Sequence, residues 1–325
     1  MRILIIKTSS LGDVIHCLPV IADIKKQYSS ALIDWVVEES FAEIPAMHAA
    51  INQVIKVAIR RWRKSLFTQK TWQEFNAFKE QLQSQQYDIV IDAQGLLKSA
   101  LLSYLSNSQN KCGYDKKSAR EGLASCFYQH KFNISYQQHA VLRNRTLAAL
   151  SLGFTPPISM PDYGIQAASK LEASISLRHP FIIALHGTSR NSKLWLTEHW
   201  LSLVNQLAAQ NIQLVLPWAS EAEHQRALLI ASKSDNAVVL PKLSIRALAN
   251  IISQSVAAVG VDTGLSHLAA ALNKHVVAIY TDTDPALTGV VAGKLACVNL
   301  GGKNLQPSPI EVLAQLNAFG VFTNV

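Results

Sequence analysis

Cysteine is scarce in this 325-residue chain, and its few copies are scattered. Cys17, Cys112, Cys126 and Cys297 show no CxxC or other metal-ligand spacing, so the sequence predicts neither a disulfide framework nor a structural metal. No segment approaches the roughly 18 consecutive apolar residues that a membrane span requires. The apolar run at the N-terminus is also too short for a signal peptide. Together these absences favour a protein of the reducing cytoplasm.

Charged residues are scarce as well, and the glycine-rich motifs of nucleotide-binding loops are absent. Only 16% of the residues are charged and 49% are hydrophobic, which is typical of a globular chain rather than a disordered one. No GxGxxG follows the first strand-like segment, which argues against a dinucleotide cofactor. Segment 289–294, GVVAGK, is one residue shorter than a P-loop, and no Ser or Thr follows it. It is therefore not interpreted as a phosphate-binding loop.

The charge that is present is mostly positive and lies mostly in the first half. The formal net charge is +8. Residues 1–165 hold 19 Lys and Arg against 13 Asp and Glu, whereas residues 166–325 hold 11 against 9. This excess predicts that the first half meets an anion, which can be a phosphorylated ligand, a membrane surface or a nucleic acid.

Strand-like and helix-like segments alternate in both halves, and a chain of this length exceeds the usual single core. The proline-rich segment Phe154–Tyr163 predicts a linker, because it continues neither a helix nor an inner strand. We therefore expect an α/β protein with two doubly wound, Rossmann-like domains, 1–165 and 166–325, facing a central cleft. An amphipathic pattern over Ser308–Phe319 predicts a last helix, for which a crossing back onto the first domain is one option.

The apolar runs and their periodicity set the predicted elements. The predicted strands are Arg2–Lys7, Leu32–Val37, Val54–Ile59, Asp88–Asp92, Phe181–His186, Ile212–Pro217, Ala237–Leu240, Val256–Val261 and Val276–Tyr280. Helices are predicted over Val14–Lys26 and Trp72–Gln85, and from near Thr197, Glu221, Ser244 and Thr263.

The most informative stretch is Val259–Pro285. An apolar run ends in Asp262-Thr263-Gly264, an amphipathic helix pattern follows, and a second apolar run closes the unit, which is the order of a parallel crossover. Ligands of open α/β sheets bind at the carboxyl ends of strands, where helix N-termini present backbone N–H groups. The turn contains an acid, a hydroxyl and a glycine, and His267 lies one turn into the helix. Such a set of groups suits the binding of a diphosphate ester. The stretch therefore predicts nucleotide binding.

Asp13 closes the small, hydroxyl-rich segment Thr8–Asp13 between the first predicted strand and the first predicted helix. Small residues there let backbone N–H groups face a ligand. Two interpretations of Asp13 stay open at this point. It can cap the helix, which is a common role for Asp, or it can act in catalysis.

Four cations surround an indole in the run Arg60-Arg61-Trp62-Arg63-Lys64, directly after the third predicted strand. Arg binds carboxylates and phosphates bidentately, so the run predicts an anion site at the carboxyl edge of the sheet. The alternatives are a solvated basic loop and a nucleic-acid patch with a stacking Trp. Three arginines lie in helical patterns nearby: Arg120, Arg143 and Arg145. They are weak evidence for a site, because most isolated arginines are only surface charges. His139 is weak evidence too, because such a histidine is more often a packed or surface residue than a site residue.

Loops of the second half carry groups that suit a nucleotide. After strand Phe181–His186, Thr188 and Ser189 can donate to phosphate oxygens, and Lys193 adds a mobile positive charge. The alternative is a polar loop without a ligand. After the next strand, a carboxylate within Glu221–Glu223 can accept hydrogen bonds from both hydroxyls of a ribose. The alternative is that this acid, in the first turn of the predicted helix, only interacts with the helix dipole.

Several long segments then give the chain a specific resemblance. They are KTSSLGDVIH, DWVVEESFAEIP, AIRRWRK, IDAQGLLKSA and QQHAV in the first half, and LHGTSRNSKLW, LPWASEAE and VDTGLSHLAAAL in the second. With them the chain resembles, over nearly its whole length, the bacterial lipopolysaccharide heptosyltransferases, the inverting GT-B glycosyltransferases of family 9 that use ADP-heptose. The basic run favours the members that add the first heptose, whose acceptor is richest in carboxylates.

The resemblance implies a GT-B fold with an acceptor site in the first domain and a donor site in the second. It implies that Asp13 is the general base and that Lys193 neutralises the departing ADP. The implied donor-binding residues are Thr188, Ser189, Lys193, Glu223, Asp262, Thr263, Gly264 and His267. The implied acceptor-binding residues are Arg60, Arg61, Arg63, Lys64 and Arg120. The implied reaction moves L-glycero-D-manno-heptose from ADP-heptose to the first Kdo of Kdo2–lipid A without a cofactor.

One loop departs from the family pattern. Where the family commonly has Gly-Pro-Thr-Asp-Pro, this chain has Thr281-Asp282-Thr283-Asp284-Pro285, a DxD triplet of a kind that can hold a divalent ion. The interpretation without a metal is the stronger one, since Asp284 precedes Pro285 in a turn and solvation accounts for Asp282.

The expected partners are ADP-heptose, Kdo2–lipid A and the anionic leaflet at the cytoplasmic face of the inner membrane, with no nucleic acid. Three alternatives remain: a transferase that adds the second heptose, a basic nucleic-acid-binding protein and a Rossmann oxidoreductase.

Overall fold

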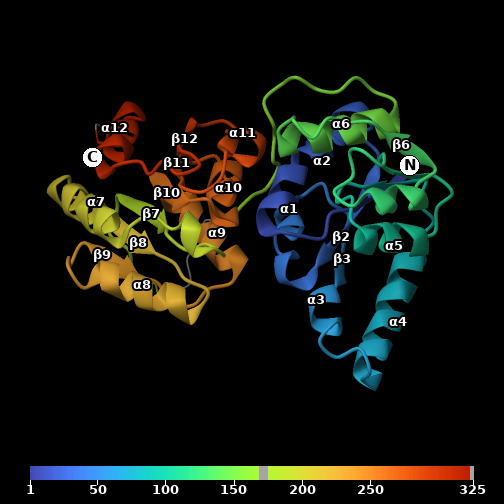
Figure 1. Cartoon of the computed structure of the whole chain (residues 1–325), viewed down its shortest axis with the longest axis horizontal. Coiled ribbons are helices and arrows are strands. Elements are labelled where there is room, and N and C mark those ends of the chain that lie inside the picture. The colour runs from blue at the N-terminus through green and yellow to red at the C-terminus, as the bar shows by residue number, and fades with distance from the viewer. Residues whose placement is uncertain (168–174, 323–325) are drawn as a thin grey trace. The chain divides into compact units, whose positions relative to one another are not determined.

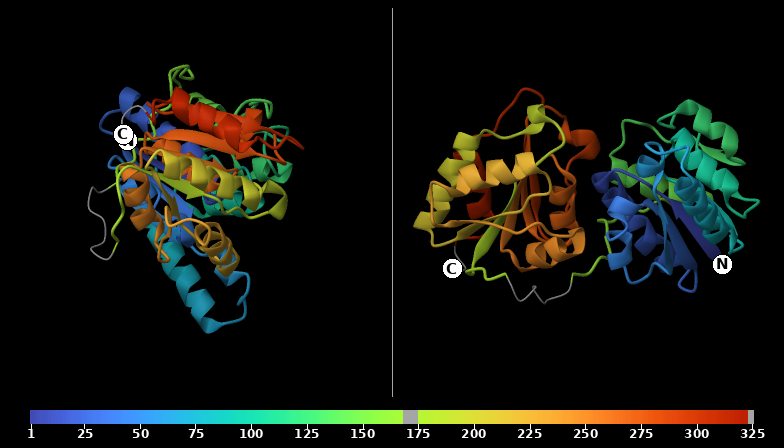
Figure 2. Two further views of the ribbon diagram at one scale, coloured as in Figure 1. Left: turned by 90° about the vertical axis from the view of Figure 1, so that its left-hand side faces the viewer. Right: turned by 90° about the horizontal axis from the view of Figure 1, so that it is seen from below.

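The computed structural model describes residues 1–167 and 175–322. The chain divides into two compact units, Met1–Ile165 (unit 1) and Gln166–Val325 (unit 2). Each unit is built on one parallel sheet that helices cover on both faces, as the ribbon views show (Figure 1, Figure 2). Each unit also has its own buried apolar core.

The sheet of unit 1 has six parallel strands in the order β3-β2-β1-β4-β5-β6. The strands are β1 Arg2–Ile6, β2 Leu32–Glu38, β3 Gln53–Val57, β4 Ile89–Asp92, β5 Lys111–Tyr114 and β6 His130–Phe132. The central strand β1 is apolar and fully buried from Ile3 to Ile6, after Arg2 at its start. Such runs are expected where helices cover both faces of a parallel sheet.

Two groups of helices cover this sheet. One group is α1 (Leu11–Cys17), α2 (Pro19–Gln27) and α6 (Ala140–Leu152), which pack against one another. The other contains α4 (Gln69–Gln83) and α5 (Leu97–Leu105), whose apolar side chains share a core with alternate residues of β1. A single helical turn, α3 (Ile59–Trp62), follows β3. The paired α3 and α4 extend beyond the edge of the sheet (Figure 1).

The sheet of unit 2 is also parallel, in the order β12-β11-β10-β7-β8-β9. The strands are β7 Phe181–Leu185, β8 Gln213–Leu216, β9 Ala237–Val239, β10 Ala257–Val261, β11 His275–Tyr280 and β12 Cys297–Gly301. The helices are α7 Thr197–Ala209, α8 Glu221–Ala231, α9 Ile245–Gln254, α10 Gly264–Ala271, α11 Pro285–Thr288 and α12 Pro309–Ala318.

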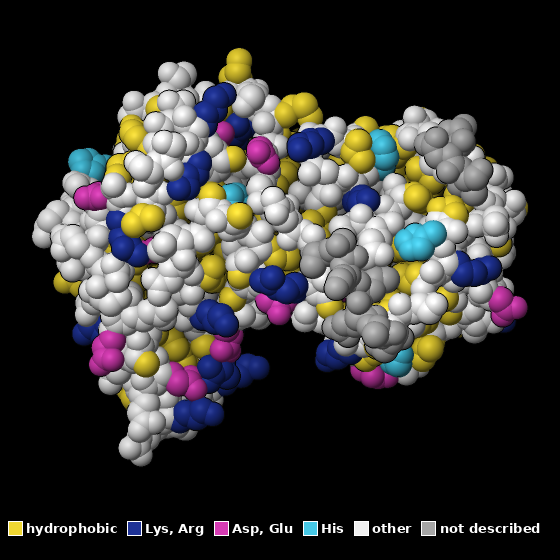
Figure 3. Space-filling view, turned by 180° about the vertical axis from the view of Figure 1, so that it is seen from behind, with side chains coloured by type: hydrophobic (Ala, Val, Ile, Leu, Met, Phe, Trp, Pro, Cys, Tyr) yellow, Lys and Arg dark blue, Asp and Glu magenta, His cyan; other side chains and the backbone are white. Residues whose placement is uncertain are grey.

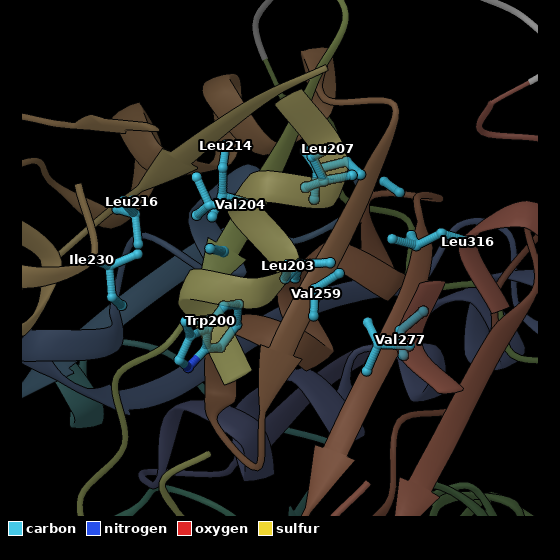
Figure 4. Packing of buried hydrophobic residues seen from close by; sticks show 14 of the residues in the cluster. Trp200, Leu203, Val204, Leu207, Leu214, Leu216, Ile230, Val259, Val277 and Leu316 are labelled. Atoms are coloured by element: carbon cyan, nitrogen blue, oxygen red, sulfur yellow. The ribbon is translucent and has the colours of Figure 1, made fainter. Parts of the chain in front are cut away.

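A core cluster of unit 2 lies under α7 (Figure 4). Trp200, Leu203 and Leu207 of this helix point toward Val259 of β10 and Val277 of β11, and all five side chains are fully buried. Their spacing of three and four residues places them on one helix face. This packing fixes the strands whose carboxyl ends carry the predicted donor residues.

Every predicted strand is present within two residues of its expected bounds, but the structure corrects two other points. The single helix predicted over Val14–Lys26 is two helices, because Pro19 starts a new one at its first position. The short strands β5, β6 and β12 were not predicted. The last helix, α12, is present as predicted; it packs against α7 and β11 and contributes to the core of unit 2.

The two sheets share one topology. Numbered within each unit, the strands follow the order 3-2-1-4-5-6, which is typical of nucleotide-binding α/β folds. In such sheets ligands bind outside the carboxyl ends of the strands, where the order reverses between the first and the fourth strand. That point lies between β1 and β4 in unit 1 and between β7 and β10 in unit 2.

Candidate active site

A cavity of about 720 Å³ in unit 1 lies where this topology predicts a ligand. It gathers residues that follow β1, β3, β4 and β5 at the carboxyl ends of these strands. Its lining residues are Ser9, Ser10, Asp13, Ile59, Arg60, Arg63, Gln94, Leu96, Leu97, Lys98, Arg120 and Glu121. The structure therefore brings the predicted base together with three of the predicted acceptor-binding arginines.

Asp13 lies in the first turn of α1, and its carboxylate is held by the preceding residues. The backbone N–H and the hydroxyl of Ser10 donate to its Oδ2 at 2.7 and 3.0 Å. The loop is fixed in turn by Gln94, whose side-chain oxygen accepts from the backbone N–H groups of Thr8 and Ser9 at 3.0 and 3.1 Å. Both bonds from Ser10 end on one oxygen of Asp13, so they do not engage Oδ1. The capping role and a catalytic role are therefore compatible.

The cavity is strongly cationic, since its lining includes Arg60, Arg63, Lys98 and Arg120. Two acids moderate this charge. Glu38 accepts from the backbone N–H of Arg60 at 2.9 Å; burial raises its pKa, and Arg60 and Lys98 oppose that rise. Glu121 accepts from the backbone N–H of Leu97 at 2.7 Å at the start of α5. The cavity thus combines fixed carboxylates with cations that face the space left for a ligand.

Lys98 is a charged residue of the cavity that sequence reasoning missed. Its Nζ donates to the hydroxyl of Ser9 at 3.2 Å, and its pKa is lowered, chiefly by burial, while Glu38 opposes the lowering. Arg60 and Arg63 lower this pKa further because they are nearby positive charges. The available signal was the place of Lys98 at the start of a helix after a predicted strand, but a lone lysine there has no distinctive spacing.

The other two predicted cations are not among the residues that line the cavity. Arg61 pairs with Glu39 at 3.0 Å and with Glu74 at 2.6 Å. Lys64 is exposed on the connection after α3. Acceptor binding by Arg61 and Lys64 stays a prediction that the cavity itself does not support.

Three arginines with weak sequence signals have defined positions. Arg145 is buried and forms a bidentate pair with Asp23 at 2.7 and 2.8 Å, so its interpretation as a surface charge is wrong. Arg143 lies over the ring of Tyr136 at 3.9 Å. Arg120 lies in the loop after β5 rather than in a helix, and this loop turns it toward the cavity.

In unit 2, the loops after β7, β10 and β11 meet at Asp262. The Nζ of Lys193 lies 2.6 Å from its Oδ2, and both side chains are largely buried. The hydroxyl of Thr188 donates to the carbonyl oxygen of Asp262 at 2.9 Å, and that of Thr283 donates to its carboxylate at 2.5 Å. Asp262 therefore fixes a flexible lysine beside the turn where α10 begins. Thr283 is a contact that the sequence did not predict.

The N-terminus of α10 adds backbone donors to this cluster. Gly264 is the first residue of the helix, and the Thr263 side chain makes no capping hydrogen bond, whereas Ser220 caps α8. A first turn without a side-chain cap has N–H groups that suit an anion, and the helix dipole has the same sign. His267 is buried one turn further along.

Glu223 lies beside the loop that follows β7. Its Oε2 accepts from the backbone N–H groups of Ala219 and Ser220 at 2.7 and 3.2 Å, so it helps to cap α8. A Cβ on Gly187 would lie only 2.6 Å from its carboxyl carbon, so the absence of a side chain there lets the carboxylate approach. This places Glu223 next to the loop that carries the exposed Ser189.

The DxD triplet is engaged in local contacts. Asp282 accepts from the hydroxyl of Ser192 at 2.6 Å, and Asp284 caps α11 by accepting from the N–H of Ala286 at 2.8 Å. In the part of the chain that the structure describes, no three His, Cys, Asp or Glu residues gather closely enough to hold a metal ion. A metal-free reaction stays a prediction.

Comparison with known families identifies the chemistry of this arrangement. The model of glycosyltransferase family 9 (heptosyltransferase) matches residues 75–310. The chain belongs to glycosyltransferase family 9. This family 9 protein is therefore an enzyme of glycosyl transfer, which removes the oxidoreductase alternative.

Similar proteins narrow the relationship further. The family 9 chain is 46% identical to lipopolysaccharide heptosyltransferase 1 of Escherichia coli strain K12 over 289 residues, which is 89% of this chain and 90% of that protein. It is 42% identical over 326 residues to lipopolysaccharide heptosyltransferase 1 of Salmonella typhimurium strain LT2, covering the full length of both. Its identity to lipopolysaccharide heptosyltransferase 2 of the same Salmonella strain is 22%.

Solved structures confirm the expected GT-B fold. The E. coli heptosyltransferase WaaC with ADP matches at a TM-score of 0.90 and 42% identity, covering 98% of this chain and 100% of that one. The same enzyme with ADP-2-deoxy-2-fluoro heptose matches at 0.86, covering 98% of this chain and 99% of that one.

Proposed function

We propose that this family 9 enzyme transfers L-glycero-D-manno-heptose from ADP-heptose to the first Kdo of Kdo2–lipid A, with inversion. The observation that carries the proposal is the cavity of unit 1, where the carboxylate of Asp13 lies among four cations. A sugar-acid acceptor suits both features, since it has a hydroxyl to deprotonate and anionic groups for Arg to bind. The name shared by the relatives at 42–46% identity supports this acceptor.

In the proposed reaction Asp13 is the general base. It takes the proton of the acceptor hydroxyl while that oxygen bonds to the anomeric carbon, and the bond from this carbon to the diphosphate breaks. A single displacement of this kind inverts the configuration. General-base assistance typically contributes ~10²–10⁴-fold to a rate. The hydrogen bonds from Ser10 hold the carboxylate in place for this step.

Unit 2 takes the donor in this proposal. Lys193 and the N–H groups at the start of α10 neutralise the charge that develops on the departing ADP, with Asp262 holding the lysine in position. Thr188 and Ser189 lie in the loop that would contact the diphosphate, and Glu223 would accept the ribose hydroxyls. The ADP and the fluorinated ADP-heptose in the WaaC structures support an ADP-linked donor. The proposal includes no cofactor and no metal.

The lipid nature of the acceptor implies contact with a membrane surface. Among the described residues, none of the helices combines the length and the apolarity needed to cross a bilayer. The excess of Lys and Arg over Asp and Glu in residues 1–165 supports peripheral docking on the anionic cytoplasmic leaflet of the inner membrane.

A panel of donors tests the proposal. ADP-heptose, ADP-mannose, UDP-glucose and NADH are each incubated with Kdo2–lipid A and, separately, with the same acceptor already carrying one heptose. Product is detected by mass spectrometry. A heptosylated product from ADP-heptose alone is expected. Product that forms only on an acceptor already carrying one heptose would instead establish the second-heptose alternative. Tight, salt-sensitive binding to any nucleic acid, without transfer, would support the nucleic-acid alternative.

A further inference from the structure

Unit 1 has a second hollow next to the cavity that holds Asp13. It is a groove of about 250 Å³ formed by α3, the connection after it and the start of α4. We call it the α3–α4 groove. Its apolar lining residues are Ile59, Trp62, Leu66, Trp72 and Phe75. Arg63 is its charged lining residue.

Large apolar side chains stay exposed at this groove. Leu66 is 51% exposed and Trp72 is 59% exposed, and the neighbouring Phe67 on the connection is 99% exposed. A cluster of large exposed apolar side chains rimmed by polar ones marks a binding surface rather than ordinary solvent-facing structure. Lys and Arg side chains, with acidic ones between them, gather on the same projecting part of unit 1 (Figure 3).

The walls of the groove are held in place by contacts within unit 1. The indole N–H of Trp62 donates to Glu74 at 2.8 Å, and its ring meets the ring of Phe75 edge-on with centroids 5.9 Å apart. Trp72 meets Phe75 in the same way at 6.2 Å. Arg61 also pairs with Glu74, which joins α3 to α4. A groove fixed in this way needs little ordering when a ligand enters it.

The groove and the cavity are adjacent. Ile59 and Arg63 line both. A single ligand that fills both spaces therefore places anionic groups among the cations of the cavity and an apolar part against the aromatic rings of the groove. Free sugar acids lack the second part. The combination fits an acidic glycolipid.

We propose that the α3–α4 groove binds an acyl chain of the lipid acceptor whose sugar acids occupy the cavity. This inference rests on the proposed function, because it takes the same molecule as the acceptor. It assigns a role to apolar residues that the transfer chemistry does not use. It also predicts that the enzyme distinguishes acylated from deacylated acceptor.

Kinetics with two acceptors test the groove. The double variant Leu66→Gln and Trp72→Gln makes its rim polar without adding charge. With intact Kdo2–lipid A we expect its kcat/KM to fall at least tenfold, mainly through KM, and with the fully deacylated glycan to stay within twofold of the wild-type value. Leu229→Gln on α8 is the matched control, because Leu229 is 52% exposed and lies in unit 2. It should change neither value.

The outcomes separate the groove from the proposed function. Equal losses on both acceptors, or no loss on either, would overturn the acyl-chain assignment while leaving heptosyl transfer in place. Transfer by the wild-type enzyme to neither acceptor would overturn the proposed function, and the inference with it.

Fluorescence gives a second test that does not depend on turnover. Kdo2–lipid A with brominated acyl chains should quench tryptophan fluorescence, and Trp72→Phe should remove a large part of that quenching. Vesicles of brominated phosphatidylglycerol without acceptor should quench much less. Equal quenching by those vesicles would assign the groove to bilayer lipids in general and overturn the proposal.

Discussion

Asp13 combines a helix cap and a proposed base in one side chain, and a single substitution separates the two roles. Asp13→Asn keeps an oxygen that can accept the hydrogen bonds from Ser10 but removes the basicity. We expect kcat to fall by ~10²–10⁴-fold with an unchanged KM for ADP-heptose, measured by steady-state kinetics. Ser10→Ala, which removes one of the two hydrogen bonds and leaves the carboxylate, should lose far less. A near-normal kcat in Asp13→Asn would eliminate Asp13 as the base.

The arginines of the basic run differ in what they already contact. Arg60 and Arg63 line the cavity, whereas Arg61 pairs with Glu39 and Glu74. We expect Arg60→Ala and Arg63→Ala each to raise the acceptor KM by about tenfold or more, because charge-assisted hydrogen bonds to an anion are the strong ones. Arg61→Ala is the matched comparison and should raise it much less. A larger effect of Arg61→Ala would show that its ion pairs open when the acceptor binds.

Sequence identified four of the twelve cavity residues one at a time, namely Asp13, Arg60, Arg63 and Arg120, but only the fold shows that they meet. Asp13, Arg63 and Arg120 follow different strands, and parallel strands bring their carboxyl ends to one edge. The sequence did not show that Arg61 and Arg63 have different surroundings. The difference arises because Arg61 pairs with two glutamates from other elements. Lys98 was missed because its burial, and not its spacing, marks it.

At the scale of elements, the proposed donor site depends on how closely α10 packs on β10. A Cβ on Gly260 would lie 2.2 Å from Oγ of Ser266 and 2.9 Å from Cβ of Leu185. Ser266 cannot move freely, since its hydroxyl donates to the carbonyl oxygen of Val261 at 2.8 Å. Any larger residue at position 260 must therefore push the start of α10, and the turn before it, away from the strand.

Gly260→Ala should accordingly weaken both unit 2 and donor binding. We expect a loss of about 1–3 kcal/mol in the free energy of unfolding, typical of overpacking, and a higher KM for ADP-heptose with an unchanged acceptor KM. Urea unfolding and steady-state kinetics measure these effects. Gly302→Ala is the control, because a Cβ there has its nearest neighbour at 3.9 Å. A Gly260→Ala protein with wild-type donor KM would show that α10 does not position the donor.

The sequence predicted best those elements whose residue pattern is determined by burial alone. β1 and β10 are apolar runs buried on both faces, so their composition is sufficient evidence. β6, with the sequence HKF, is held at the sheet edge by backbone pairing and carries little apolar signal. The break between α1 and α2 could have been predicted from Pro19.

At the scale of the whole molecule, two units with one topology carry two complementary sites. No sequence repeat reveals the shared strand order, because the order follows from packing and handedness rules that many sequences satisfy. The candidate residues of each unit nevertheless lie at its own reversal point. One site combines a carboxylate with cations, which suits the proposed acidic acceptor, and the other combines a lysine with a helix N-terminus, which suits the proposed leaving nucleotide.

The stability of unit 2 should depend on pH through a buried histidine. Burial lowers the pKa of His186 to about 4; Glu223 and the hydrogen bond to the carbonyl of Pro217 oppose the lowering, and Arg226 adds to it. In the unfolded chain its pKa is near ~6.5. The unfolded chain therefore binds this proton first, and stability that is fully present above about pH 6.5 is lost as the pH falls toward 4. A shift of this size corresponds to at most about 3 kcal/mol.

His186→Gln removes this titration while keeping a side-chain N–H for the carbonyl of Pro217. We expect the protection of β7 and β10 amides to fall less steeply in the variant than in the wild-type protein between pH 6.5 and 4.5. Hydrogen exchange followed by mass spectrometry, corrected for the pH dependence of intrinsic exchange, measures this protection. The amides of β1 in unit 1 serve as the internal reference, and above pH 7 the two proteins should respond to pH alike. If protection fell with the same slope in both proteins below pH 6.5, His186 would be protonated in the folded state as readily as in the unfolded one. Burial in unit 2 would then not control its charge.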